Sequence, residues 1–144
     1  MAAVKQFAGS AVDGATVGDV VVSTSAACNR LFADTLEGQS IRFAVGSAAI
    51  EAGSDPLLEA ITTLAKSCPG EFSVEGHTDD TGNAPGNQRL SQLRAEAVVA
   101  ALERRGLESS RMTALGFGST RPKAPGFSDD ARALNRRIEF RFSE

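Results

Sequence analysis

The sequence of 144 residues has the length of one domain and can form a core of moderate size. It is 42% hydrophobic and carries a net charge of −3, which excludes a global basic field for nucleic acid or an anionic membrane. No apolar stretch approaches the roughly 18 residues that span a bilayer, so we expect no transmembrane segment in this chain.

Residues 1–25 are rich in Ala, Gly, Val and Ser, and they include one stretch, 15–23, that could form an isolated strand. They lack the continuous apolar run of a signal peptide. We interpret them as a linker or the remnant of a preceding module, and we place the folded domain at residues 26–144. The chain is then either cytosolic or was exported with its signal already removed.

Apolar spacing after residue 26 predicts helices and strands in alternation. In 54–70, a Ser-Asp-Pro start and a Pro-Gly end bracket apolar residues at helical spacing. The alternation of Ile138, Phe140 and Phe142 indicates a strand. The predicted helices are 27–37, 54–70, 88–109 and 128–137, and the predicted strands are 40–47, 71–76, 111–119 and 137–144. This order favours an α/β layer pair in which helices cover a sheet.

The stretch 76–96 (GHTDDTGNAPGNQRLSQLRAE) contains the only histidine of the chain, His77, close to Glu75, Asp79 and Asp80. Catalytic zinc usually takes three protein ligands, commonly including two or more histidines, and no cysteine is near in sequence. The acids also lack the alternate spacing and terminal Glu of a calcium loop. We therefore expect no metal site and no cofactor.

Hydrolytic chemistry has little support in this stretch. Ser91, His77 and Asp79 could be imagined as a nucleophile, base and acid, but no GxSxG motif or oxyanion-loop signal accompanies Ser91. Nothing near Asp79 and Asp80 signals the raised pKa that a glycosidase acid needs. The glycine-containing turn 116–122 lacks the Walker lysine pattern of a phosphate loop. We expect no enzymatic activity.

A polar pocket at the end of the strand 71–76 is the remaining functional interpretation. The following loop contains Thr78, Asp79 and Asn87, and Arg94 lies 15 residues after Asp79, near the start of the predicted helix. Asp79 and Arg94 converging on one hollow would suit a zwitterion, with its ammonium at Asp79 and its carboxylate held by both prongs of Arg94. Spacing alone favours the simpler alternative, in which the two side chains pair with each other.

The same residues carry a resemblance to a known family. Residues 75–98 resemble the peptidoglycan-binding signature of OmpA-like C-terminal domains, which runs roughly T-D-x-x-G, then N, then L-S-x-x-R-A. Downstream, 116–122 and 131–140 match the family segments G-x-G-x-x-x-P and G-R-x-x-N-R-R-[VI]-E. The resemblance covers about residues 28–142. The signature is matched by Thr78, Asp79, Gly82, Asn87, Leu90, Ser91, Arg94 and Ala95.

The resemblance implies a βαβαβαβ fold of the α+β type, with helices packed on a four-stranded mixed sheet. It also implies non-covalent binding of the peptidoglycan stem peptide, through the diaminopimelate of the wall, by a periplasmic or envelope protein associated with the outer membrane. Alternatives are the wall-anchoring domain of a stator or secretion complex and, with weaker support, a cell-wall hydrolase. The ligand-binding positions implied are Asp79, Arg94, Asn87, Thr78, Leu90 and Arg136.

The resemblance also bears on residues outside the pocket. Cys28 and Cys68 are 40 positions apart, and on the sequence alone they are either two buried thiols or a disulfide. Because family members work where disulfides persist, the resemblance implies a Cys28–Cys68 bridge. It implies that His77 shapes the loop, that Asn135 ties the last helix to the loop, and that Arg137 is a surface or scaffold charge.

Two positions depart from the family pattern. Gly126 stands where the family often has Asn, and Ala131 stands where it often has Gly. Both positions lie in the connection before Asn135. The departures therefore leave the path of that connection open, and they affect the pocket less.

Overall fold

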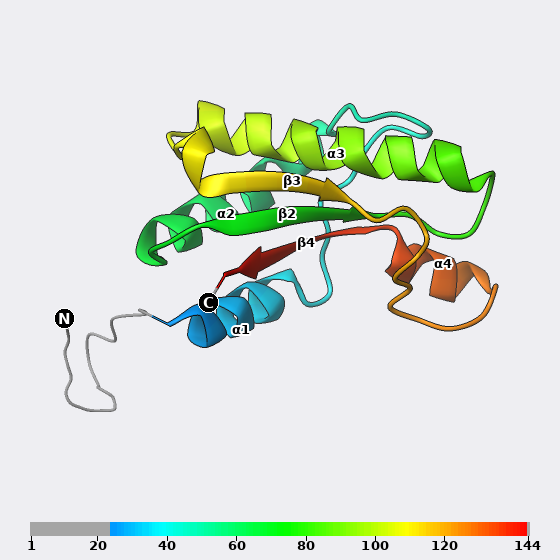
Figure 1. The fold of residues 1–144 in the computed structure, drawn as a ribbon, viewed down its shortest axis with the longest axis horizontal. Helices are drawn as coiled ribbons and strands as arrows, with labels where there is room; N and C mark the ends of the chain where they lie inside the picture. The colour runs from blue at the N-terminus through cyan, green and yellow to red at the C-terminus, as the bar shows by residue number, and fades with distance from the viewer. Residues whose placement is uncertain (1–23, 144) are drawn as a thin grey trace.

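The computed structural model describes residues 24–143, so the expected strand at 15–23 and nearly all of the linker lie outside the described residues. Figure 1 shows a sheet with helices α1 and α3 along its two sides and α2 behind it. None of the described helices combines the length and apolar character needed to cross a membrane. The elements are α1 (Ser25–Leu36), η1 (Ala52–Ser54), α2 (Asp55–Ser67), β2 (Phe72–His77), α3 (Ala84–Arg104), η2 (Ser109–Arg111), β3 (Met112–Gly116), α4 (Asp129–Asn135) and β4 (Arg137–Phe142).

The sheet has strand order β3-β2-β4, in which β2 is parallel to β3 and antiparallel to β4. The α/β architecture and the mixed sheet are therefore confirmed. The prediction of four strands is wrong for the described residues, because 40–47 forms only an isolated bridge between Phe43 and Ile50. The alternation there is misleading: Val45 is fully exposed, and Gly46 turns the chain with φ of 65°.

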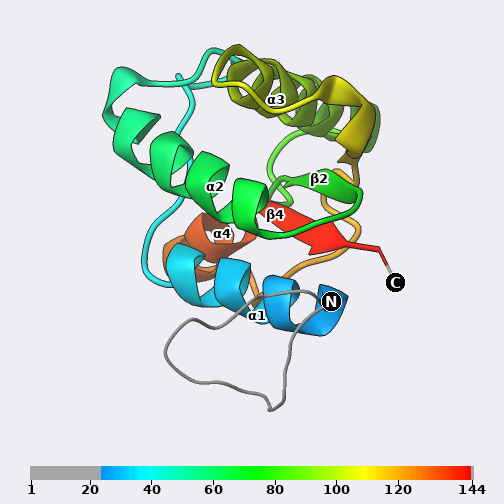
Figure 2. The same cartoon turned by 90° about the vertical axis from the view of Figure 1, so that its left-hand side faces the viewer.

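The two faces of the sheet differ in their cover. Phe72 and Val74 on β2, together with Phe140 and Phe142 on β4, are buried in the core. Phe32 of α1 packs onto this face, with its ring centroid 5.1 Å from that of Phe142. In Figure 2, α2 lies beside the strands, with α3 above them and α1 below. Because side chains alternate along a strand, the odd-numbered residues Ser73, Glu75 and His77 of β2 and Arg137, Glu139 and Arg141 of β4 point to the opposite face, which no described helix covers (Figure 1).

Helix α3 approaches the sheet so closely that glycine is required at the contact. A Cβ on Gly76 of β2 would lie 2.3 Å from the backbone oxygen of Ser91, and one on Gly116 of β3 would lie 2.5 Å from the backbone nitrogen of Gln92. The side chain of Gln92 also bonds the edge of β3, donating to the carbonyl of Ala114 and accepting from the N–H of Gly116. This contact sets the height of α3 above the strands.

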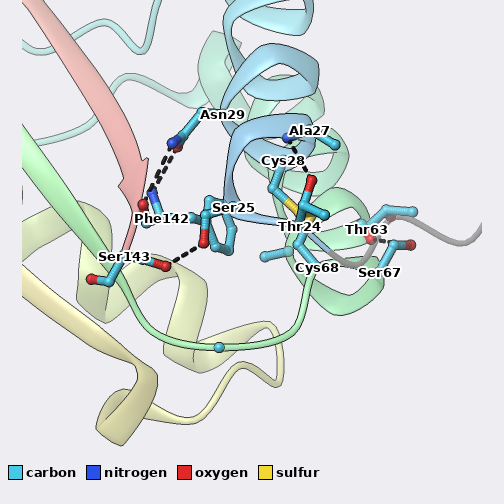
Figure 3. Close-up of a disulfide and its surroundings, with 12 residues drawn as sticks. Thr24, Ser25, Ala27, Cys28, Asn29, Thr63, Ser67, Cys68, Phe142 and Ser143 are labelled. Carbon is cyan, nitrogen blue, oxygen red and sulfur yellow. Dashed lines mark hydrogen bonds between the residues drawn. A yellow bond between two sulfur atoms is a disulfide. The ribbon is translucent and has the colours of Figure 1, made fainter. Parts of the chain in front are cut away.

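The predicted disulfide is present between Cys28 of α1 and Cys68 at the end of α2, with their Cα atoms 6.0 Å apart (Figure 3). Both cysteines are buried. Next to the bridge, the side chain of Asn29 accepts from the N–H of Phe142 and donates to its carbonyl, as Figure 3 also shows. The bridge and the amide therefore fasten α1 to a second helix and to the free edge of β4.

Removing the disulfide with the double substitution Cys28→Ala and Cys68→Ala should lower the free energy of unfolding by on the order of 4 kcal/mol, because the bridge closes a long loop in the unfolded chain. Urea unfolding measures this loss. Reductant should destabilise the wild type by a similar amount and leave the double variant unchanged. Titration of two free thiols in the untreated native protein would contradict the assignment.

Gly116→Ala should destabilise the fold by about 1–3 kcal/mol, because the new methyl group meets helix backbone that cannot rotate away. Gly53→Ala is the matched control, since a Cβ at Gly53 has no neighbour within 4 Å. Thermal unfolding of the two variants checks the difference. Equal melting temperatures would show that α3 does not depend on this close approach.

Candidate ligand-binding site

The candidate site lies where β2 ends and the chain enters the loop before α3. The N–H of Thr78 donates to the carbonyl of Gly118 at 2.8 Å, which joins this loop to the one after β3. Asn83 begins α3 by accepting from the N–H of Gly86 at 2.7 Å. The helix therefore starts at Ala84, four residues earlier than predicted, and Arg94 lies well inside it.

Asp79 is held in place by two hydrogen bonds. Its Oδ1 accepts from the N–H of Thr81 at 2.8 Å, and its Oδ2 accepts from Nη1 of Arg136 at 2.6 Å. Burial on its own would raise the pKa of Asp79, but the hydrogen bonds from Thr81 and Arg136 outweigh it and bring the pKa below its ordinary 3.8. Asp79 is therefore a carboxylate at neutral pH.

Arg94 does not pair with Asp79. Its Nε donates to the backbone oxygen of Ser47 at 2.8 Å, and its guanidinium carbon lies 4.9 Å from the centroid of the Phe43 ring. The simple alternative of a direct Asp79–Arg94 pair is wrong, because Arg136 takes the place of Arg94. Burial lowers the pKa of Arg94, the charge of Arg136 lowers it further, and the charge of Asp79 raises it. Arg94 and Arg136 line the same hollow and Arg136 bonds to Asp79, so the three charges lie in one neighbourhood.

A hollow of about 580 Å³ opens beside these residues. Its charged lining is mostly positive, with Glu51 as the one acid among its lining residues. Asp79 does not line the hollow, but its bonded partner Arg136 does. The lining includes Arg42, Phe43, Glu51, His77, Arg94, Arg136 and Arg137.

The other three predicted ligand residues have different positions. The side-chain nitrogen of Asn87 donates to the carbonyls of Thr81 at 3.0 Å and Asp79 at 3.4 Å, so it supports the loop. Thr78 is buried and lines a second, smaller hollow of about 240 Å³. Leu90 is half-buried on α3 and lines neither hollow.

The side of the hollow that contacts Arg94 could not be predicted from the sequence. This side is the turn between Phe43 and Ile50, in which the N–H of Ala44 donates to the carbonyl of Ala49 at 2.9 Å. Arg94 reaches it over a separation of 47 residues. The contact uses a backbone oxygen of Ser47, so no motif marks it, and only the aromatic Phe43 could have suggested it.

Comparison with known proteins identifies the chain. Residues 42–136 match the OmpA family, and they include both the turn that contacts Arg94 and the Asp79–Arg136 pair. The chain belongs to the OmpA family.

The relatives of this chain are longer proteins of different kinds. The chain is 47% identical over 66 residues to outer membrane porin F of Pseudomonas fluorescens, covering 46% of this chain and 20% of the porin. It is 31% identical over 107 residues to peptidoglycan-binding protein ArfA of Mycobacterium tuberculosis, covering 74% of this chain and 33% of ArfA. The chain thus spans only a fifth to a third of these relatives.

One solved structure has the same fold and aligns with most of this chain. The cell wall anchor of the T6SS from Pseudomonas aeruginosa has a TM-score of 0.68 and 31% identity, covering 81% of this chain and 97% of that one. The likeness therefore extends over most of the chain.

The OmpA-family segment around Asn135 is ordered by hydrogen bonds. Oδ1 of Asn135 accepts from the N–H groups of Lys123 and Ala124, and its Nδ2 donates to the carbonyl of Ala124. Asn135 therefore ties the last helix by hydrogen bonds, as predicted, but to the connection at 123–124 and not to the loop that contains His77. Gly126 has φ of +94°, a conformation that glycine adopts freely and asparagine tolerates, which explains the exchange at this position.

His77 and Arg137 lie between the hollow and the helix-free face of the sheet. The His77 ring stacks on Phe117 at 5.3 Å, and burial, aided by the charge of Arg137, lowers its pKa to about 4. Arg137 donates to Glu139 and to the carbonyls of Asn135 and Arg121. Its three partners make Arg137 a scaffold charge, as predicted.

Arg136→Gln should raise the pKa of Asp79, because the carboxylate loses its charge-assisted hydrogen bond and keeps only the one from Thr81. Carboxyl ¹³C NMR over a pH series measures the pKa. Arg132→Gln, which removes the partner of the adjacent Asp80, is the control and should change the pKa of Asp79 less.

The sign of the linked stability follows from the same shift. The pKa of Asp79 is lower in the folded than in the unfolded chain, so its stabilising contribution is complete above pH 3.8 and disappears as the pH falls through the folded-state pKa. A wild-type Asp79 pKa at or above 3.8 would contradict the ion pair.

Proposed function

We propose that this domain binds the stem peptide of peptidoglycan non-covalently, by clasping the zwitterionic end of diaminopimelate between Arg94 and Asp79. The observation that carries the proposal is the state of Arg94. It is a half-buried cation that lines the hollow, and within the described chain no carboxylate bonds to it. A ligand carboxylate would supply the missing partner, in the two-pronged geometry that guanidinium groups favour.

The ammonium of the ligand is assigned to Asp79. Oδ1 of Asp79 stays bonded to Thr81, while Oδ2 is bonded to Arg136, whose side chain is 49% exposed. The half-exposed guanidinium of Arg136 can turn toward solvent, and the ligand ammonium then replaces it as the cation bonded to the buried Asp79 carboxylate. Arg136 lines the hollow, so after leaving Asp79 it is positioned to bind the same ligand carboxylate as Arg94 or a second one.

The relatives support the choice of ligand class. ArfA is named a peptidoglycan-binding protein, and the T6SS structure is titled a cell wall anchor. We extend wall binding to this chain and infer a location in the periplasm or cell envelope, as part of an outer-membrane-associated protein joined through the linker at 1–25. One diaminopimelate offers few atoms, so single contacts are weak, and repeated engagement of a polymeric wall supplies the retention.

A second candidate has a specific observation in its favour. The likeness to the T6SS anchor covers 97% of that structure, so the domain would serve equally as the wall anchor of a secretion complex. The binding step is the same in both cases, and neither requires catalysis. The two differ in what is attached outside the domain, and isolation of the full-length partner complex from cells distinguishes them.

Arg94→Ala and Asp79→Ala should each abolish sedimentation of the protein with insoluble diaminopimelate-type sacculi. Each removes a charge-assisted contact of about 1.5–3 kcal/mol, which corresponds to a loss of about tenfold or more. Arg89→Ala is the matched control on the same helix, because Arg89 is exposed and does not line the hollow. Circular dichroism verifies that the three variants are folded.

Titration with free diaminopimelate refines the test. The NMR signals of Arg94 and Phe43 should shift in the wild type, and lysine, which lacks the second carboxylate-bearing centre, should shift them less. Normal sedimentation of both Arg94→Ala and Asp79→Ala would refute the assignment of the site.

A further inference from the structure

Three side chains of β2 and β4 form a second constellation, which does not include Arg94 or Asp79, although His77 also lines the hollow beside Arg94. Glu75 and His77 are two residues apart on β2 and therefore point to the same face. Glu139 on β4 is the cross-strand partner of Glu75. The potential ligand atoms of the three side chains all lie within 4.8 Å of one another.

The histidine of this group is buried without a hydrogen-bond partner. The His77 side chain is 2% exposed, and neither Nδ1 nor Nε2 has a partner among the described residues. Its Nε2 lies 3.9 Å from Oε1 of Glu139, too far for a hydrogen bond. Because an unsatisfied buried polar group costs about 1–3 kcal/mol, a ligand for this nitrogen would be stabilising.

Each of the two carboxylates has one oxygen with short bonds and one with only long contacts. Oε2 of Glu139 accepts from Arg137 at 2.5 Å, and Oε2 of Glu75 accepts from Ser73 at 2.8 Å and from Arg141 at 3.2 Å. The Oε1 atoms have only long contacts with Arg141, at 3.5 Å for Glu75 and 3.8 Å for Glu139. Like charges directly opposite each other on adjacent strands repel, so a cation between them is favourable.

We propose that Glu75, His77 and Glu139 form a binding site for a divalent transition-metal ion such as Zn²⁺, which would link β2 to β4. Zn²⁺ binds carboxylate oxygens and imidazole nitrogens, so two carboxylates, one imidazole and a water give it four ligands, although sets with two or more histidines are commoner. Ligand atoms around tetrahedral zinc lie about 3.3 Å apart, so side-chain movements of about 1 Å complete the site. Glu139 is 34% exposed, which gives the ion access from solvent.

Arg137 and Arg141 contact the carboxylates and therefore compete with the metal ion. Removing this competition is the sharpest test of the proposal. Arg141 is 58% exposed and contacts both carboxylates, so Arg141→Gln should tighten zinc binding by freeing them. Glu139→Gln should weaken it at least tenfold. Glu71→Gln is the matched control, since it removes an exposed acid next to β2 that is outside the group, and it should leave affinity unchanged.

The experiment is isothermal titration of the full chain, without a histidine tag, with ZnCl₂. His77 is the only histidine and the described chain holds no free cysteine, so ¹H–¹⁵N spectra of the imidazole report this site alone. We expect one ion per chain, a shift of Nε2, and a higher melting temperature with zinc in the wild type but not in Glu139→Gln. An unshifted imidazole, or equal zinc affinity in Glu139→Gln and wild type, would overturn the proposal, whatever the result with peptidoglycan.

Discussion

The contact between α3 and the sheet is the constraint on which both the loop and the hollow depend. Ser91 is fully buried, and its hydroxyl accepts from the N–H of Gly118 at 2.9 Å. Its backbone oxygen leaves no room for a side chain at Gly76, and its hydroxyl and the backbone of Gln92 leave none at Gly116. Ser91 therefore acts as a structural residue, and not as the nucleophile of a hydrolase. Because Arg94 lies one helical turn after Ser91, the position of Ser91 also determines where the Arg94 side chain projects from α3.

The charged residues around the hollow do not form a single Asp79–Arg94 ion pair. Asp79 bonds to Arg136, which lines the hollow together with Arg94, while Arg94 itself rests against Phe43 and a backbone carbonyl. In this arrangement Arg94 is a cation at the hollow with no carboxylate of the described chain bonded to it. Without ligand, Arg136 satisfies Asp79 and a backbone carbonyl satisfies Arg94, and these are the partners that the proposed zwitterion would replace.

Strand β2 supplies residues to two different environments by simple alternation. Phe72 and Val74 enter the core, whereas Glu75 and His77 point to the face that no helix covers. On that face, the burial of His77 comes from strand side chains and from Phe117, so its nitrogens lose water without gaining protein partners. The polar face of the sheet is therefore a functional candidate in its own right, next to the hollow.

The sequence by itself determined the parts of this protein that depend on local spacing. Helices, three of the strands and the Asn135 tie follow from apolar periodicity, capping residues and a long ordered motif, and residues such as Asp79 and Arg94 were identifiable from the same motif. The failed strand at 40–47 shows the limit of alternation, because Val45 belongs to a turn that faces solvent.

Tertiary structure alone decided which side chains meet. The partner of Asp79 is 57 residues away and the partner of Arg94 is a backbone oxygen 47 residues away, so neither contact has a local signal. The sequence also argued against a metal site because only one histidine lies near Asp79. Pairing of β2 with β4 places Glu139 beside Glu75 and His77, since antiparallel register joins residues that are remote along the chain.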